Sequence, residues 1–226
     1  MTEESATPAA TPTKSPAHGA PRVVGIGCAA VIAVPLLVIL GYAITYSVQR
    51  STPEDYPRMA PEEMGRRVAG NSQEAYTALG FNRVVPQTGE DSENYTASSY
   101  CYPGGLESIA DQSVDGAYRL YHRWALDNVP KNEALPALRR LREHLKDSGW
   151  RITDYGQSKD ANEWNLQAQR GGHSEDGGDY EVSFSWNANR QSFTGGSGAP
   201  CAYDPQWKKS DPLPGTELEP PGLTPR

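Results

Sequence analysis

The pattern of hydrophobic and polar positions divides the chain into segments of different character. Residues 1–21 are rich in Ala, Thr, Pro and Ser and show no apolar period, which predicts a disordered N-terminal tail. Residues 22–49 predict a transmembrane helix, 50–60 a short polar stalk, and 61–203 a folded domain. Residues 204–226 are rich in proline and predict a second tail that is disordered or extended.

The first strong signal is an uncharged run. No residue from Val23 to Gln49 carries a charge. About 20 helical residues cross the hydrocarbon core of a bilayer, so the run is long enough to span it, with boundaries at Val23 and Val48. The alternative is a cleaved signal peptide, whose apolar core is usually about 7–15 residues long. The length of the run favours a retained single-pass anchor in the cell membrane.

Small residues recur at intervals of four within this run, at Gly25, Ala29 and Ala33. Such spacing lets two membrane helices approach closely, which makes a weak homodimer a candidate. The alternative is that Gly and Ala are simply common in membrane helices.

Alternation of apolar and polar residues marks the strands. It is clearest over 118–127, 163–169 and 180–187, where one set of alternate positions is aromatic or aliphatic and the other is polar. Shorter strands are expected at Trp150–Ile152, around Phe193 and from Tyr95 to Cys101. Strict alternation means that one face of the sheet is buried and the other is wet, which is typical of antiparallel sheets.

Two helices are expected in the folded domain. Pro61 suits a first helical position, and Gly80 suits the end of that helix, but we expect Gly70-Asn71-Ser72 to interrupt it. A second helix should be capped by Asn132 and stopped by Gly149. Its buried stripe is formed by leucines at helical spacing, namely Leu135, Leu138, Leu141 and Leu145.

These elements predict an α+β fold in two layers. An antiparallel sheet of about four to five strands would carry the leucine-striped helix on one face. The opposite, wet face would present Asn165, Gln167, Ser183 and Ser185. We regard that face as one candidate binding surface, and the arginines on the wet side of the helix as another.

Cysteine usage bears on the compartment. Cys101 and Cys201 lie on either side of most of the folded domain, and a pair outside the membrane predicts a disulfide. The alternative is two buried free thiols. Positive charges flank the uncharged run on both sides and leave its orientation open. An oxidised pair would place the C-terminal domain on the extracytoplasmic side.

Charge and motifs exclude more than they identify. The formal net charge of −7 argues against nucleic-acid binding. No cofactor or metal motif is present, and His122 is expected to be a hydrogen-bonded core residue. The loop from His173 to Asp179 gathers an imidazole and carboxylates, but its spacing does not match a calcium loop, and a solvated hairpin loop is the simpler interpretation. Asn94-Tyr95-Thr96 is a glycosylation sequon.

One segment has a familiar layout. The stretch LPALRRLREHLKDSGWRITDYG is followed by two alternating strands and a late cysteine, and preceded by an Ala/Pro/Thr-rich N-terminus and one hydrophobic run. In this layout the chain resembles small membrane-anchored or secreted proteins of high-GC actinobacteria. The resemblance implies an envelope location and brings no activity or site residues with it.

The sequence therefore favours a non-catalytic interaction module that is anchored in the membrane and binds an envelope protein or polymer. One alternative is an envelope hydrolase or metal-dependent enzyme that uses the loop from His173 to Asp179. Another is a structural or sensory subunit that acts through the membrane helix.

Overall fold

A computed structural model describes residues 24–51, 54–87, 93–103, 112–159, 162–171 and 179–225, although side chains before residue 33 and from 49 to 53 are outside the description. The chain divides into two compact units, Met1–Val48 and Gln49–Arg226. The predicted tail of residues 1–21 lies outside the described residues.

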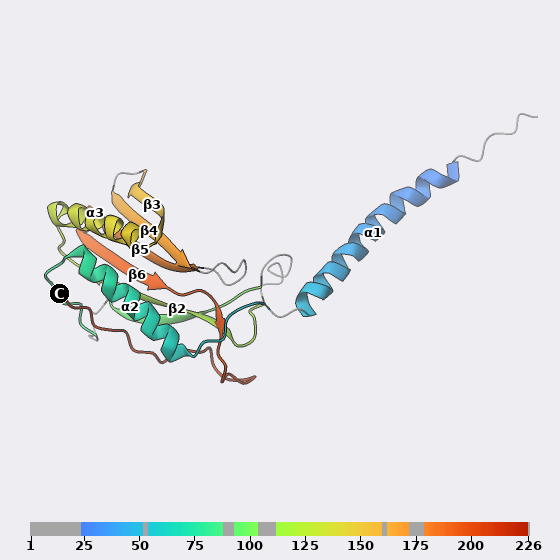
Figure 1. The fold of residues 1–226 in the computed structure, drawn as a ribbon. Helices are drawn as coiled ribbons and strands as arrows, with labels where there is room; N and C mark the ends of the chain where they lie inside the picture. Colours follow the sequence, from blue (N-terminus) through green and yellow to red (C-terminus); the bar gives the residue numbers. More distant parts are fainter. Residues whose placement is uncertain are drawn as a thin grey trace, which may run out of the picture. The chain divides into compact units, whose positions relative to one another are not determined.

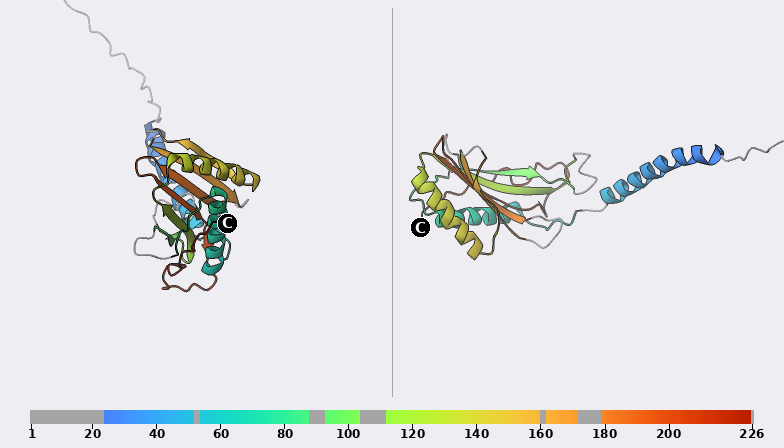
Figure 2. Two further views of the ribbon diagram at one scale, coloured as in Figure 1. Left: turned by 90° about the vertical axis from the view of Figure 1, so that its left-hand side faces the viewer. Right: turned by 90° about the horizontal axis from the view of Figure 1, so that it is seen from above.

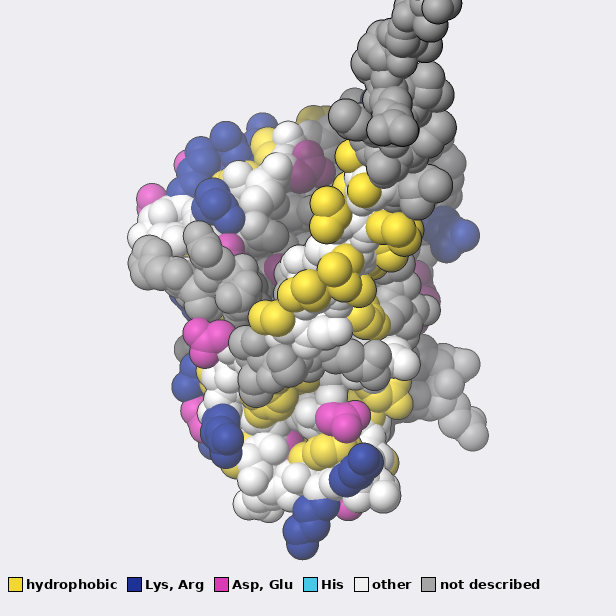
Figure 3. Space-filling model, turned by 90° about the vertical axis from the view of Figure 1, so that its right-hand side faces the viewer, with side chains coloured by type: hydrophobic (Ala, Val, Ile, Leu, Met, Phe, Trp, Pro, Cys, Tyr) yellow, Lys and Arg dark blue, Asp and Glu magenta, His cyan; other side chains and the backbone are white. Residues whose placement is uncertain are grey.

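The first unit contains all but the last three residues of helix α1, Val24–Ser51, which includes Pro35. From residue 33 to Val48 its large apolar side chains are exposed, and they form the run of yellow side chains along this helix (Figure 3). In the part of the chain that the structure describes, no helix is both long enough and apolar enough to cross a membrane. The span from Val23 to Val48 stays a prediction from the sequence.

The second unit is an α+β domain, as predicted. Its helices and strands are α2 (Pro61–Leu79), β1 (Tyr95–Tyr100), β2 (Ala117–Leu126), α3 (Lys131–Asp147), β3 (Arg151–Gln157), β4 (Glu163–Gly171), β5 (Asp179–Asn187), β6 (Ser192–Gly198) and β7 (Ala202–Tyr203).

The strands form one antiparallel sheet in the order β1-β2-β6-β5-β4-β3, with β7 pairing the start of β2 (Figure 1). Within the described residues, the sheet has seven strands in place of the four to five expected, because β1 and β6 both pair with β2 and the short strand β7 pairs with it as well. Both α2 and α3 cover the same face of the sheet, whereas a single covering helix was predicted (Figure 2).

The core lies between this sheet face and the two helices. The Trp124 ring occupies space that a side chain at position 195 would need, since a Cβ on Gly195 would come within 2.3 Å of it. Only glycine at this point lets β6 pass beneath the indole. Glycine on β6 is therefore a packing requirement on the helix-covered face.

Helix α2 is continuous through Gly70-Asn71-Ser72, so the predicted interruption is wrong. Tertiary packing outweighs the poor helix propensity of these residues, because buried positions continue on both sides of Ser72, which is itself fully buried. The helix ends as predicted at Gly80, whose φ of 68° is left-handed. Helix α3 begins at Lys131, and its N-cap is Pro130 in place of the predicted Asn132. As predicted, the chain leaves this helix through Gly149, whose φ of 81° is left-handed.

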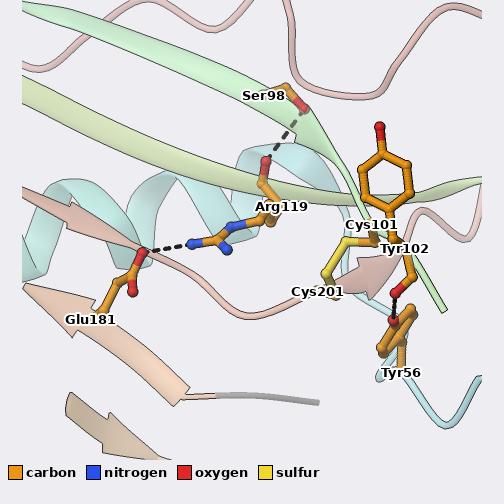
Figure 4. The surroundings of a disulfide bond; sticks show 7 residues. All are labelled: Tyr56, Ser98, Cys101, Tyr102, Arg119, Glu181 and Cys201. Atoms are coloured by element: carbon orange, nitrogen blue, oxygen red, sulfur yellow. Dashed lines mark hydrogen bonds and ion pairs between the residues drawn. A yellow bond between two sulfur atoms is a disulfide. The ribbon is translucent and has the colours of Figure 1, made fainter. Parts of the chain in front are cut away.

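The segment predicted as a stalk belongs to the folded unit from residue 54 onward. Arg58 forms a bridge with Tyr203, and the Tyr118 hydroxyl donates to the Met59 carbonyl at 2.7 Å. Tyr56 is buried and donates to the Tyr102 carbonyl (Figure 4). A polar composition predicted a linker, but the main-chain hydrogen bonds to Tyr203 of β7 and the two tyrosine hydroxyl hydrogen bonds fix the segment against the domain.

Of the two alternatives predicted for the tail at 204–226, disorder is wrong and an extended chain is correct for the described residues 204–225. Leu223 is fully buried in the core and pairs with Val85 through main-chain hydrogen bonds of 2.9 Å. The Asn94 amide donates to the Pro221 carbonyl, and the Ser98 hydroxyl donates to the Pro214 carbonyl. Prolines keep the tail extended, and its carbonyls are satisfied by side chains of the domain.

The predicted cysteine pair is present. Cys101 and Cys201 form a disulfide with an S–S distance of 2.00 Å, and it links the end of β1 to the segment before β7 (Figure 4). Cys101 is buried together with Tyr56 and Ala117 in a small cluster of its own. The disulfide joins the end of β1 to the C-terminal region, and the cluster around it adds Tyr56 from the segment after α1.

Candidate functional site

The sheet face without helices carries a groove of about 530 Å³. It lies across β1, β2, β6 and β5, and its side chains are those that point away from the core. Tyr95, Tyr121 and Arg123 stand on one side, and Glu181 and Ser183 on the other. A volume of this size is within the range of about 300–1,000 Å³ that ligand sites occupy.

The floor of the groove is made by two glycines at successive outward positions of β6. Gly198 pairs with Tyr121 on one side and with Glu181 on the other, and Gly196 lies between Arg123 and Ser183. Because these two positions lack side chains, the outward side chains of β2 and β5 stand above β6 on either side. The groove is thus a direct result of strand register.

Aromatic rings and an arginine form the wall on β1 and β2. The rings of Tyr95 and Tyr121 meet edge to face at 6.4 Å between centroids. The Arg123 guanidinium lies 5.8 Å from the centre of the Tyr121 ring. Tyr95 is 46% exposed, so an apolar ring face remains available at the sheet edge.

An ion pair stands at one end of the groove. Arg119 and Glu181 approach to 2.6 Å (Figure 4), and Glu181 is the neighbour of Gly198 on β5. Glu181 leans over the glycine, since a Cβ there would lie 2.9 Å from its carboxylate oxygen. The pair is partly exposed, and we expect it to shape the groove more than it stabilises the fold.

A polar cluster lies beneath the other face of the same strands. His122 contacts Asn94 Oδ1 through Nε2 at 2.6 Å and the Ser72 hydroxyl through Nδ1 at 2.8 Å. Ser72 also contacts the Ser197 hydroxyl at 3.0 Å. Burial lowers the pKa of His122 to about 4, so the ring is neutral at neutral pH. The expectation of a hydrogen-bonded core histidine is confirmed.

The cluster has the residue types of a nucleophilic triad but not the access that a triad needs. Ser72 is 0% exposed and His122 is 1% exposed, so no substrate carbonyl can reach the hydroxyl. Its physical role is to satisfy polar groups in the core between α2, β1, β2 and β6.

In the folded domain, the asparagine of the sequon Asn94-Tyr95-Thr96 is not accessible for glycosylation. The Asn94 side chain is buried, and its amide nitrogen donates to the carbonyls of Pro86 and Pro221 at 2.7 and 2.8 Å. Both amide protons are thus engaged in the fold. Glycosylation at this asparagine is incompatible with the native packing.

The candidate catalytic loop falls largely outside the described residues, which omit 172–178 and with them His173. Asp179 is described and pairs with Arg151 at 3.1 Å. Among the described residues, no group of His, Cys, Asp and Glu side chains could hold a metal ion. Of the predicted dimer face Gly25, Ala29 and Ala33, the surfaces of Gly25 and Ala29 also lie outside the description.

The arginines on α3 do not form a single surface. Arg140 donates to the Leu79 carbonyl at the end of α2, and Arg142 lies 4.7 Å from the centre of the Tyr155 ring. Both side chains are engaged within the domain. The wet sheet face is the better of the two candidate surfaces that the sequence indicated.

Sequence reasoning placed Ser183 on this face but missed the groove. Tyr95, Tyr121 and Arg123 fall within predicted strands, but alternation alone marks only the face on which each side chain lies and not a ligand site. The register that sets glycines between these walls joins β2 to β6, which are far apart in the sequence. No protein-family model, curated protein or solved structure matches this chain.

Proposed function

We propose that this protein is a non-catalytic binding module that is held at the extracytoplasmic surface of the cell membrane by its N-terminal helix. Its groove would bind an envelope protein or polymer. The observation that carries the proposal is the groove over Gly196 and Gly198, which combines the exposed ring of Tyr95 and the half-buried ring of Tyr121 with polar side chains on a sheet.

The chemistry of the groove favours binding over catalysis. A general acid or base works best with a pKa near the operating pH. Among the described residues, the histidine nearest the groove is His122, which is buried beneath the sheet with its pKa lowered to about 4. The side chains that do face the groove offer hydrogen bonds, ring faces and opposite charges, which are the means of recognition.

The membrane location rests on the sequence and on exposed apolar surface. The run from Val23 to Gln49 is uncharged. In α1, side chains such as Leu37 and Val38 are 67% and 66% exposed, and apolar surface of this extent is unfavourable in water. A lipid bilayer would bury it. The resemblance to membrane-anchored or secreted actinobacterial proteins points the same way.

The cysteine pair supports the proposed extracytoplasmic orientation. A disulfide between Cys101 and Cys201 persists in an oxidising compartment. Thiol labelling of intact and permeabilised cells, with and without reductant, tests this part of the proposal. Labelling of both cysteines only after permeabilisation, without any need for reductant, would contradict it.

Site-specific crosslinking tests the binding function. A photoreactive amino acid at Tyr95, inside the groove, should form adducts in native membranes. The matched control is Tyr100 on the same strand, which is 54% exposed and does not line the groove. Adducts that depend on position 95, and that disappear when Ser183→Leu fills the groove, are the expected result.

The contrary results are equally clear. Identical adducts from positions 95 and 100 would show nonspecific proximity, and adducts that survive Ser183→Leu would place the partner elsewhere. Either outcome would remove the groove as the binding site. Ser183 is exposed, so the substitution should leave the fold intact.

A further inference from the structure

We propose that the groove on the helix-free sheet face binds an uncharged saccharide chain. This inference rests on the proposed binding function and narrows it to one class of ligand. It is drawn from three properties of the groove: its balance of charge, its position on the sheet, and the kinds of side chain that line it.

The positive and negative charges of the side chains at the groove are equal in number. Arg119 is paired with Glu181 at 2.6 Å. The remaining charged lining residues are Arg123 and Glu93, one of each sign. An anion attracted to Arg123 would also be repelled by the carboxylates of Glu93 and Glu181, and a cation attracted to the carboxylates would be repelled by Arg123, so neither gains a net attraction that offsets its desolvation. A ligand without net charge is the best electrostatic match.

The position of the groove disfavours an extended peptide. Peptides that join a sheet do so at an edge, where main-chain donors and acceptors are unpaired. The groove instead lies over the middle of the sheet, above β6, whose main chain pairs with β2 on one side and β5 on the other. A ligand here must bind through side chains and bring its own hydrogen-bonding groups.

The lining also disfavours a lipid tail. Ser183, Thr194 and Glu181 line the groove, and an alkyl chain would bury their polar atoms without partners. A saccharide brings hydroxyl groups that both donate and accept, and hydroxyl and carboxylate side chains can satisfy them.

The tyrosines supply the complementary apolar surface. One face of a pyranose ring carries aliphatic C–H groups, and these are attracted to the negative face of an aromatic ring. Tyr95 and Tyr121 stand as neighbours on β1 and β2, with ring centroids 6.4 Å apart. The glycine floor between this wall and Ser183 gives a flat base on which a sugar can approach the main chain.

Calorimetric titration of the full-length protein tests the assignment. The protein is kept in a zwitterionic detergent without a sugar headgroup, because a maltoside would compete. The probes are uncharged hexasaccharides built from glucose, mannose, galactose or N-acetylglucosamine, with an acidic hexagalacturonate as the charged control. At least one uncharged hexasaccharide should bind one-to-one, and the acidic hexamer should bind at least 10-fold more weakly.

Matched variants locate the binding. Tyr95→Ala and Ser183→Leu should each weaken saccharide binding at least 10-fold, whereas Tyr100→Ala should change it less than 2-fold. Near-ultraviolet circular dichroism confirms that each variant is folded. The proposal is overturned if no uncharged hexasaccharide binds, or if Tyr95→Ala and Ser183→Leu both bind as tightly as the parent protein.

The crosslinking experiment separates the two levels of the proposal. If position 95 captures a partner that Ser183→Leu abolishes while no saccharide binds, the groove is a binding site for another class of ligand and the saccharide assignment is wrong. If neither groove-dependent capture nor saccharide binding occurs, the binding function itself fails.

Discussion

Asn94 fixes the position of the ring proton on His122. The amide nitrogen of Asn94 donates to two main-chain carbonyls, at Pro86 and Pro221, so its oxygen must face the imidazole. In the neutral ring the proton therefore sits on Nε2, and Nδ1 accepts from the Ser72 hydroxyl. One buried asparagine thereby connects the C-terminal tail, the loop after α2 and the centre of the sheet.

Replacing this asparagine should destabilise the fold. Asn94→Ala leaves the His122 Nε2 proton and two carbonyls without their partner, and each buried unsatisfied group costs roughly 1–3 kcal/mol. We expect the free energy of unfolding in urea to fall by at least that amount. Asn189→Ala, in an exposed turn, is the matched control and should change it by less than about 0.5 kcal/mol. Equal effects of the two substitutions would contradict the role assigned to Asn94.

The stability of the domain should depend on the charge state of His122. Its pKa is lowered from 6.5 to about 4 by burial, so below pH 6.5 the unfolded chain takes up a proton that the folded protein does not. This contribution is complete above pH 6.5 and is lost as the pH falls toward 4. The difference in pKa corresponds to roughly 3 kcal/mol.

Comparison with a variant isolates this contribution from that of the carboxylates. The free energy of unfolding of the parent protein and of His122→Gln is measured at pH 7.5 and at pH 4. The parent should lose roughly 3 kcal/mol more than the variant over this interval. Parallel losses would show that His122 does not titrate differently in the two states.

The disulfide should contribute strongly to stability. Cys101 and Cys201 are separated by 100 residues, and closing a loop of that length stabilises a domain by about 4–5 kcal/mol in the chain-entropy model. The double substitution Cys101→Ser and Cys201→Ser should lower the urea midpoint accordingly, and so should reductant acting on the parent protein. Reductant should have no effect on the double variant. A parent midpoint that is insensitive to reductant would argue against the bond.

The C-terminal tail should be a structural part of the domain. Leu223→Ala removes a fully buried side chain from the core, and such truncations cost about 2–5 kcal/mol. Val84→Ala shortens a side chain that is 60% exposed and should be nearly neutral. Urea denaturation of the two variants distinguishes a docked tail from a loose one. A neutral Leu223→Ala would mean that the tail is not packed in solution.

Local signals explain the elements that were predicted correctly. Alternation over 118–127 identified β2, and the leucine stripe identified α3, because side chains on opposite faces of one element report burial directly. The interruption predicted in α2 failed because Ser72 is held by contacts across the core, which no local propensity reflects. The docking of the C-terminal tail is not predictable for the same reason, since proline content does not report the core contacts of Leu223.

The sequence by itself determined the α+β class, which sheet face is wet, and the cysteine pair, because each is written in residue periodicity or residue type. Only the tertiary structure decided that β6 lies between β2 and β5, and hence that Gly196 and Gly198 form a floor between Tyr121 and Glu181. Strand pairing across long separations depends on the total packing of the core, which no short window of sequence contains.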